Sequence, residues 1–162
     1  FSSRPGHGSV FKVTIPVTPG AKAAPAAALH VRGQARGLRL LAAEDDAAMR
    51  LILEIKMEQL GHAVTIVGDG LAALKEAAGG GYDCILMDMH MPIMNGPDAV
   101  RAIRAAEAAR GDGKRVPIIA ITADLIPERV RGFSAAGVDE IAGKPVNWEV
   151  VAAQILKMTH GS

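Results

Sequence analysis

Six polar residues each end a short apolar run or follow one directly. They are Glu44, Asp45, Asp46, Asp88, Thr122 and Lys144. Each has an ordinary structural explanation: Asp46 can cap a helix, Thr122 can bond a turn, and Lys144 can be a solvated charge. Their recurrence at the ends of four separate apolar runs favours one shared site instead.

Several carboxylates and one amine suggest phosphate and metal chemistry. Carboxylates a few ångströms apart repel one another, which raises the pKa of at least one unless a cation lies among them. Oxygen ligands of this kind suit Mg²⁺, which can neutralise a phosphoryl group while a neighbouring carboxylate accepts it covalently. Asp88 is the predicted nucleophile. Lys144 would pair with the phosphoryl charge, and the Thr122 hydroxyl would bond a phosphoryl oxygen.

The elements that must position these residues alternate between strands and helices. Strands are predicted at 38–45, 63–67, 82–88, 116–123 and 139–144. Helices are predicted at about 47–60, over the LAALKEAA segment after GDG, at 97–109, from near Pro127, and after an Asn147 cap. Five βα units predict an α/β fold with a mainly parallel sheet, in which the functional crevice lies at the carboxyl ends of the strands.

Composition restricts the classes of function. The 162 residues are 49% hydrophobic and 22% charged, with a net charge of +1, so bulk electrostatic binding of nucleic acid or an anionic membrane is not expected. The single cysteine, Cys84, lies in an apolar run and is predicted to be a buried structural thiol. Neither a signal peptide nor an apolar run of about 18 residues is present, which predicts a soluble, cytoplasmic protein without membrane contact.

Four motifs resemble the response-regulator receiver family. AEDDAAMRLIL, ILMDMHMPIMNG, PIIAITA and GKPV follow in that order within residues 38–159. The resemblance implies a flavodoxin-like, doubly wound sheet of five parallel strands in the order 2-1-3-4-5, with five helices. It also implies that Asp88 takes a phosphoryl group from a kinase phosphohistidine in the presence of Mg²⁺.

The resemblance assigns further roles by position. Glu44 and Asp45 correspond to the acid pair that holds the metal together with Asp88, and the backbone carbonyl of His90 would complete the metal shell. Counting from the following helix favours Glu44 and Asp45 over a pair that includes Asp46. Thr122 corresponds to the switch hydroxyl and Lys144 to the amine that pairs with phosphate. Receivers of this family often have a cis peptide bond before the proline that corresponds to Pro145.

Two positions depart from the pattern of many receivers. Ile141 occupies a position where an aromatic residue often changes rotamer on activation, so an aromatic switch is excluded there. Asp124, two residues after Thr122, replaces a residue that is often small. Its carboxylate would repel the phosphoryl group or orient attacking water, and we expect it to affect the lifetime of the phosphorylated state.

The first 37 residues differ in character from the rest. Residues 1–17, in which GHGS precedes VFKVTIPV, are similar to the end of a histidine-kinase ATP-binding domain, and residues 18–37 read as an Ala/Pro/Gly-rich linker. A hybrid histidine kinase is therefore the implied parent. The expected partners are a histidine kinase domain in the same parent chain and a histidine phosphotransfer protein, with no nucleic acid. The fragment itself is not expected to be an enzyme.

Two other functions compete with this interpretation. A degenerate receiver that acts only as a docking module would lack the acceptor, the acid pair or the lysine, and all of them are present. A phosphohydrolase with an aspartyl-phosphate intermediate usually has a second acid two residues after its nucleophile, where this chain has His90.

Overall fold

The computed structural model describes residues 2–4, 8–10 and 37–159, and the chain divides into two units, Phe1–Gln34 and Ala35–Ser162. In the first unit, β1 (Ser2–Arg4) pairs antiparallel with β2 (Gly8–Val10). Nearly all of the strand predicted from VFKVTIPV, and residues 18–36 of the predicted linker, lie outside the described residues. The kinase remnant at 1–17 and the linker therefore remain predictions.

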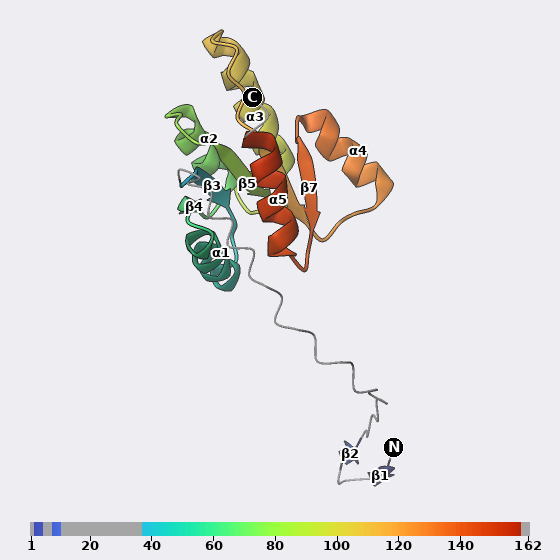
Figure 1. The fold of residues 1–162 in the computed structure, drawn as a ribbon. Coiled ribbons are helices and arrows are strands. Elements are labelled where there is room, and N and C mark those ends of the chain that lie inside the picture. The colour runs from blue at the N-terminus through green and yellow to red at the C-terminus, as the bar shows by residue number, and fades with distance from the viewer. Residues whose placement is uncertain (1, 5–7, 11–36, 160–162) are drawn as a thin grey trace. The chain divides into compact units, whose positions relative to one another are not determined.

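The second unit is built on a five-stranded parallel sheet (Figure 1). Its strands are β3 (Arg39–Ala43), β4 (Ala63–Val67), β5 (Cys84–Asp88), β6 (Ile118–Thr122) and β7 (Glu140–Gly143). Their spatial order is β4-β3-β5-β6-β7. Counted from β3, this is the predicted order 2-1-3-4-5, so the flavodoxin-like fold is confirmed.

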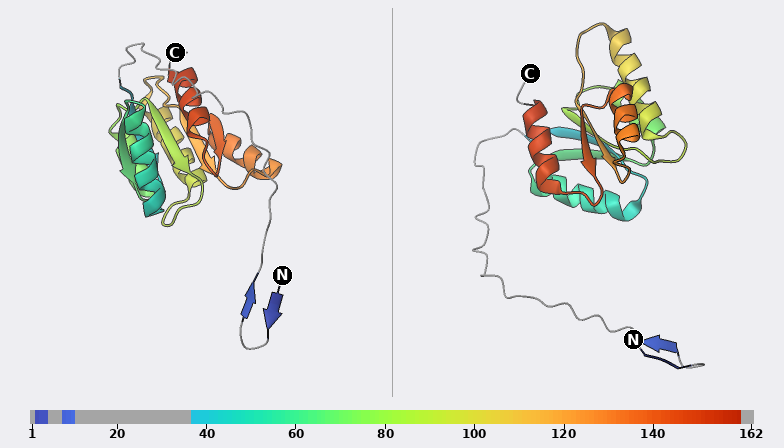
Figure 2. Two further views of the ribbon diagram at one scale, coloured as in Figure 1. Left: turned by 60° about the horizontal axis from the view of Figure 1, so that its bottom comes forward. Right: turned by 90° about the vertical axis from the view of Figure 1, so that its right-hand side faces the viewer.

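Five helices cover the two faces of the sheet. They are α1 (Ala47–Gln59), α2 (Gly70–Ala78), α3 (Gly96–Arg110), α4 (Pro127–Ala136) and α5 (Trp148–Thr159). Buried residues of α1 and α5 pack on one face, and those of α2, α3 and α4 pack on the other. Figure 2 shows the resulting three layers.

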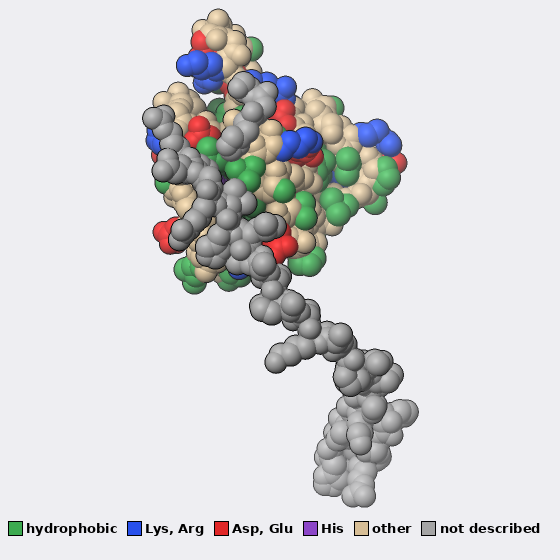
Figure 3. All heavy atoms as spheres, viewed as in Figure 1, with side chains coloured by type: hydrophobic (Ala, Val, Ile, Leu, Met, Phe, Trp, Pro, Cys, Tyr) green, Lys and Arg blue, Asp and Glu red, His purple; other side chains and the backbone are tan. Residues whose placement is uncertain are grey.

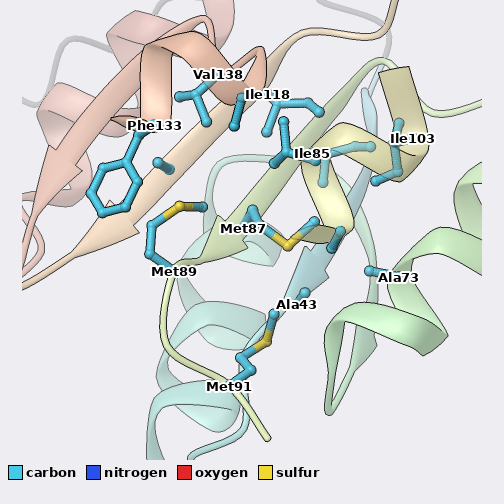
Figure 4. Close-up of a cluster of buried hydrophobic side chains, with 14 of the residues drawn as sticks. Ala43, Ala73, Ile85, Met87, Met89, Met91, Ile103, Ile118, Phe133 and Val138 are labelled. Carbon is cyan, nitrogen blue, oxygen red and sulfur yellow. The ribbon is translucent and has the colours of Figure 1, made fainter. Parts of the chain in front are cut away.

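The central strands are buried on both faces, which explains their continuous apolar sequences. All residues of β5 and β6 are buried. On the face covered by α2, α3 and α4, Met87 and Met89 pack with Phe133 and Ile103 (Figure 4). Cys84 is fully buried, as predicted, and burial raises the pKa of its thiol to about 12, so the thiol stays protonated and unreactive.

Side-chain caps fix where the helices begin. The Asp46 carboxylate accepts a hydrogen bond from the Met49 N–H at 2.8 Å, so Asp46 caps α1, which is the ordinary structural explanation considered for it. Asn147 likewise accepts from the first turn of α5. The first strand of the sheet ends at Ala43 rather than at residue 45, so Glu44 and Asp45 lie in the loop before α1. Within the described part of the chain, the helices are too short or too polar to cross a membrane.

Candidate functional site

Three carboxylates meet at the carboxyl edge of the sheet. Glu44 and Asp45 lie in the loop after β3, and Asp88 ends the neighbouring strand β5. One carboxylate oxygen from each lies within 4.8 Å of the others. Glu44 and Asp88 are only 2% and 4% exposed, whereas Asp45 is exposed to solvent. Parallel strands bring these residues together because their carboxyl ends share one edge.

Lys144 brings a positive charge to the two buried carboxylates. It follows β7, and its Nζ lies 2.6 Å from Asp88 Oδ2 and 3.1 Å from Glu44 Oε2. Burial lowers the pKa of Lys144, but its hydrogen bonds and proximity to the two acids outweigh this effect and raise it overall. Burial raises the pKa of Glu44, and the Lys144 hydrogen bond opposes that rise. Lys144 precedes a cis bond to Pro145, as expected.

Thr122 lies beside this cluster at the end of β6. Strand pairing places Ile121 opposite Asp88, so Thr122 follows at the same edge. Its backbone carbonyl accepts from the Lys144 N–H at 2.7 Å, and its buried hydroxyl oxygen accepts from the Asp124 N–H at 3.0 Å. The predicted site residues Asp88, Thr122 and Lys144 therefore occupy one continuous edge of the sheet.

The loop after β5 surrounds the other side of Asp88. The His90 N–H donates to Asp88 Oδ1 at 2.9 Å, and the His90 side chain is exposed. Each Asp88 carboxylate oxygen therefore has one donor, the His90 amide or Lys144. Gly96 begins α3 so close to the Asp88 carbonyl and Met89 Cα that a side chain there would contact backbone atoms. The role of the His90 carbonyl as a metal ligand stays a prediction.

Two neighbouring side chains were not predicted to take part. Arg50, in the first turns of α1, places Nη1 3.5 Å from the Glu44 carbonyl oxygen. Arg129 places Nε 3.2 Å from Asp124 Oδ2. The Asp124 carboxylate, expected to act on the phosphoryl group, is thus paired with a cation of α4. The sequence offered only a weak signal for this pair, an arginine five residues after an aspartate.

The cluster has the donor chemistry of a magnesium site. Glu44, Asp45 and Asp88 offer carboxylate oxygens, which hard divalent cations prefer. Lys144 supplies one positive charge against these acids, and the raised pKa of Glu44 indicates that burial disfavours its charged form. A divalent cation would relieve this cost, so the residues present fit Mg²⁺.

Comparisons with known proteins agree with this architecture. The family model described as "Response regulator receiver domain" matches residues 40–156. The sensory/regulatory protein RpfC of Xanthomonas campestris is 36% identical over 129 residues, which are 79% of this chain and 17% of RpfC. The chain therefore spans about a sixth of the length of this curated relative.

Two solved structures share the fold. The receiver domain of sensor histidine kinase PA1611 from Pseudomonas aeruginosa, with a magnesium ion coordinated in its active site cleft, is matched at a TM-score of 0.70 and 33% identity, covering 77% of this chain and 99% of that one. The second is a co-crystal structure of the Saccharomyces cerevisiae histidine phosphotransfer signaling protein Ypd1 and the receiver domain of its downstream response regulator Ssk1. It is matched at a TM-score of 0.71 and 25% identity, covering 76% of this chain and 90% of that one.

Proposed function

The chain belongs to the response regulator receiver family, and on that premise we propose that it accepts a phosphoryl group on Asp88 from a phosphohistidine and passes it on within a phosphorelay. The observation that carries the proposal is the convergence on Asp88 of two further carboxylates and the Lys144 ammonium. A module used only for docking would not need this convergence. A receiver role in two-component signalling follows from the family itself.

Asp88 is the nucleophile of the proposed transfer. One of its carboxylate oxygens forms a bond to phosphorus while the bond from phosphorus to the donor's imidazole nitrogen breaks. The imidazole leaves with the bonding electron pair and takes up a proton, and Asp88 becomes an aspartyl phosphate. Charge on the transferred group is spread over its oxygens, so positioning and electrostatic stabilisation dominate the catalysis.

The neighbouring groups have distinct roles in this proposal. Glu44, Asp45 and Asp88 would hold Mg²⁺, with the His90 carbonyl as a further ligand, and the metal would neutralise phosphoryl charge. Lys144 turns from the Asp88 carboxylate to the phosphoryl oxygens. The Thr122 hydroxyl donates a hydrogen bond to the same group. Both contacts bias the loops after β6 and β7 toward a second arrangement.

The parent protein and the partner are inferred from the relatives. The full-length protein is proposed to be a hybrid histidine kinase whose kinase domain is the phosphodonor, because one relative is described as hybrid signal transduction histidine kinase I of Dictyostelium discoideum. The onward partner is a histidine phosphotransfer protein, as in the Ypd1 and Ssk1 complex. An apolar patch on α1 suits a helical partner beside the acidic cluster: Leu51, Ile52 and Ile55 are 58%, 42% and 44% exposed.

Intact mass spectrometry tests the acceptor directly. The chain is incubated with Mg²⁺ and acetyl phosphate, beside Asp88→Asn and a matched control, Asp112→Asn, which changes an exposed turn aspartate. We expect one added phosphoryl group in the unmutated chain and in the control, none in Asp88→Asn, and none in the presence of a chelator. If the folded, unmutated chain gains mass from neither acetyl phosphate nor a phosphohistidine donor, the proposal is contradicted and a docking module is favoured.

A further inference from the structure

A second concave site lies at the opposite edge of the sheet from Asp88. Its volume is about 480 Å³, within the range of small-molecule pockets. The wall is formed by the end of α2 with the glycine segment 79–81, by α3, by the loop 111–117 and by the start of β5. Because β5 begins at this pocket and ends at Asp88, the pocket is separate from the acidic cluster.

The floor of the pocket is apolar. It is formed by Leu74, Ala77, Ile85, Ile103, Ala106 and Val116. Several of these belong to the core under α2 and α3 or pack against it, so the floor is held rigidly. An apolar floor of this kind favours a ligand with a hydrocarbon or aromatic body.

The acids on the pocket wall already have partners. Glu107 is buried, and its two oxygens accept from Arg104 at 2.7 Å and from the Val116 N–H at 2.8 Å. Asp83 accepts from the Arg39 N–H at 2.7 Å. The third acid, Asp112, accepts from the Lys114 N–H at 3.0 Å and lies 3.7 Å from Arg110. These acids are therefore poorly placed to recruit a cationic ligand.

Three cations of the described chain lie on the wall, and Arg115 already pairs with Asp139 at 2.8 Å and donates to the Gly137 carbonyl at 2.9 Å. The other two, Arg110 and Lys114, have weaker contacts or no ion pair within the part that the structure describes. Among the described residues, the Lys114 ammonium forms no ion pair, and the Arg110 pair is long and partly exposed. Lys and Arg side chains gather at the tip formed by the end of α3 and the loop after it (Figure 3). An anion at this rim would gain a charge-assisted hydrogen bond without displacing an existing partner.

We propose that this pocket binds a small organic anion with an apolar body, such as an aryl sulfonate or carboxylate. The acidic group lies at Lys114, beside the Arg110 guanidinium, and the apolar body lies on the floor between α2 and α3. The site is independent of phosphoryl transfer, so its failure and that of the proposed function are distinguishable. Asp88→Asn should bind the anion as well as the parent does.

The test uses the 162-residue chain with 8-anilinonaphthalene-1-sulfonate as the probe, titrated by fluorescence and by calorimetry. We expect saturable binding at one site. Lys114→Gln should weaken binding by about two- to fivefold, the range for a partly exposed charge pair. Lys75→Gln makes the same charge change on α2 outside the pocket lining and should leave the affinity unchanged.

Two further variants separate the pocket from other apolar surface. Ala106→Phe fills the floor and should abolish binding, and Ala77→Phe does the same from α2 should the first variant not fold. Ile52→Gln removes exposed apolar surface on α1 and should have no effect. The proposal is overturned if the parent shows no saturable binding up to about 1 mM, near the weak end of measurable affinity. Unchanged affinity in a folded filling variant, or loss of binding in Ile52→Gln, would overturn it as well.

Discussion

Lys144 Nζ lies 2.6 Å from Asp88 Oδ2, although 56 residues separate the two in the chain. The contact places a cation on the carboxylate that is proposed both to help hold the metal and to accept the phosphoryl group. If the proposed function holds, Lys144 competes with Mg²⁺ for Asp88 before transfer and stabilises the phosphoryl group afterwards. Removal of the Lys144 charge should therefore raise the affinity for Mg²⁺ but lower the rate of phosphoryl acceptance.

Lys144→Gln should bind Mg²⁺ about five- to tenfold more tightly than the parent, because one positive charge near the metal is removed. The same variant should accept phosphoryl groups more slowly. Calorimetric titration with MgCl₂ measures the first effect, and intact mass over time measures the second. Lys157→Gln is the matched control, since Lys157 is exposed and pairs with Glu140 outside the cluster. Weaker Mg²⁺ binding in Lys144→Gln would show that the amine assists the metal instead of competing with it.

Asp124→Ala should lengthen the lifetime of the phosphorylated state. A carboxylate beside Thr122 would shorten that lifetime, either by repelling the phosphoryl group or by orienting attacking water. The expected change is about two- to fivefold, since the carboxylate is partly exposed and paired. Arg129→Ala frees the same carboxylate and should shorten the lifetime. The loss of phosphorylated mass after removal of the donor measures both, and equal decay in parent and Asp124→Ala would refute the role.

The strands of the sheet were predictable because each is a short apolar run bounded by glycine, proline or charged residues, whereas their order was implied by the resemblance to receivers. The strand ends were not predictable, since apolar sequence continues where strand pairing stops. The fourth predicted strand included Val116 and Pro117, but β6 begins at Ile118. Proline cannot donate a ladder hydrogen bond, so the ladder starts after it.

The carboxylates of the site were predictable from topology, whereas their partners were not. Parallel strands place Glu44 and Asp88 at one edge whatever their side-chain rotamers. The second contact of Lys144, to Glu44, and the pairing of Asp124 with Arg129 depend on distances that only the folded loops set. The spacing of residues in the sequence does not determine such distances.

Gly96→Ala should destabilise the fold and slow phosphoryl acceptance. A Cβ at this position would contact the Asp88 carbonyl and Met89 Cα, which are backbone atoms and cannot turn aside. Overpacking of this kind costs about 1–3 kcal/mol. Gly132→Ala is the matched control, because Gly132 lies in α4 with open space around it and should gain about 0.5–1 kcal/mol. Urea unfolding measures both, and an unchanged Gly96→Ala would contradict the close contact.

Stability should fall as the pH is lowered through the unfolded pKa of His62. Burial lowers the pKa of this imidazole in the folded state, so between the folded and unfolded values the unfolded chain binds more protons. The stabilising effect is therefore fully present above about pH 6.5 and is lost as the pH falls through the folded pKa. Urea unfolding at pH 7.5, 6.5 and 5.5 should show a decline that is smaller in His62→Gln. Parallel declines would contradict this assignment.

Arg104→Ala should lower the free energy of unfolding by about 3 kcal/mol, because it removes the cation paired with the buried Glu107 and leaves the Val116 carbonyl without its donor. The guanidinium donates to Glu107 at 2.7 Å, to Asp139 at 2.6 Å, and to the carbonyl oxygens of Val116 and Gly137 at 2.8 and 3.0 Å. It thereby ties α3 to the segments that precede β6 and β7. The Arg104 side chain is 15% exposed, so solvent compensates little of the loss.

Arg101→Ala is the matched control for this variant, since Arg101 lies one turn earlier on the same helix. Its ion pair with Asp98 is exposed on both sides, and its loss should cost less than about 1 kcal/mol. Arg104→Lys should recover only part of the stability, because an ammonium cannot present the fork of donors that reaches four acceptors. Equal losses in Arg101→Ala and Arg104→Ala would show that the Arg104 contacts add nothing beyond an ordinary surface charge.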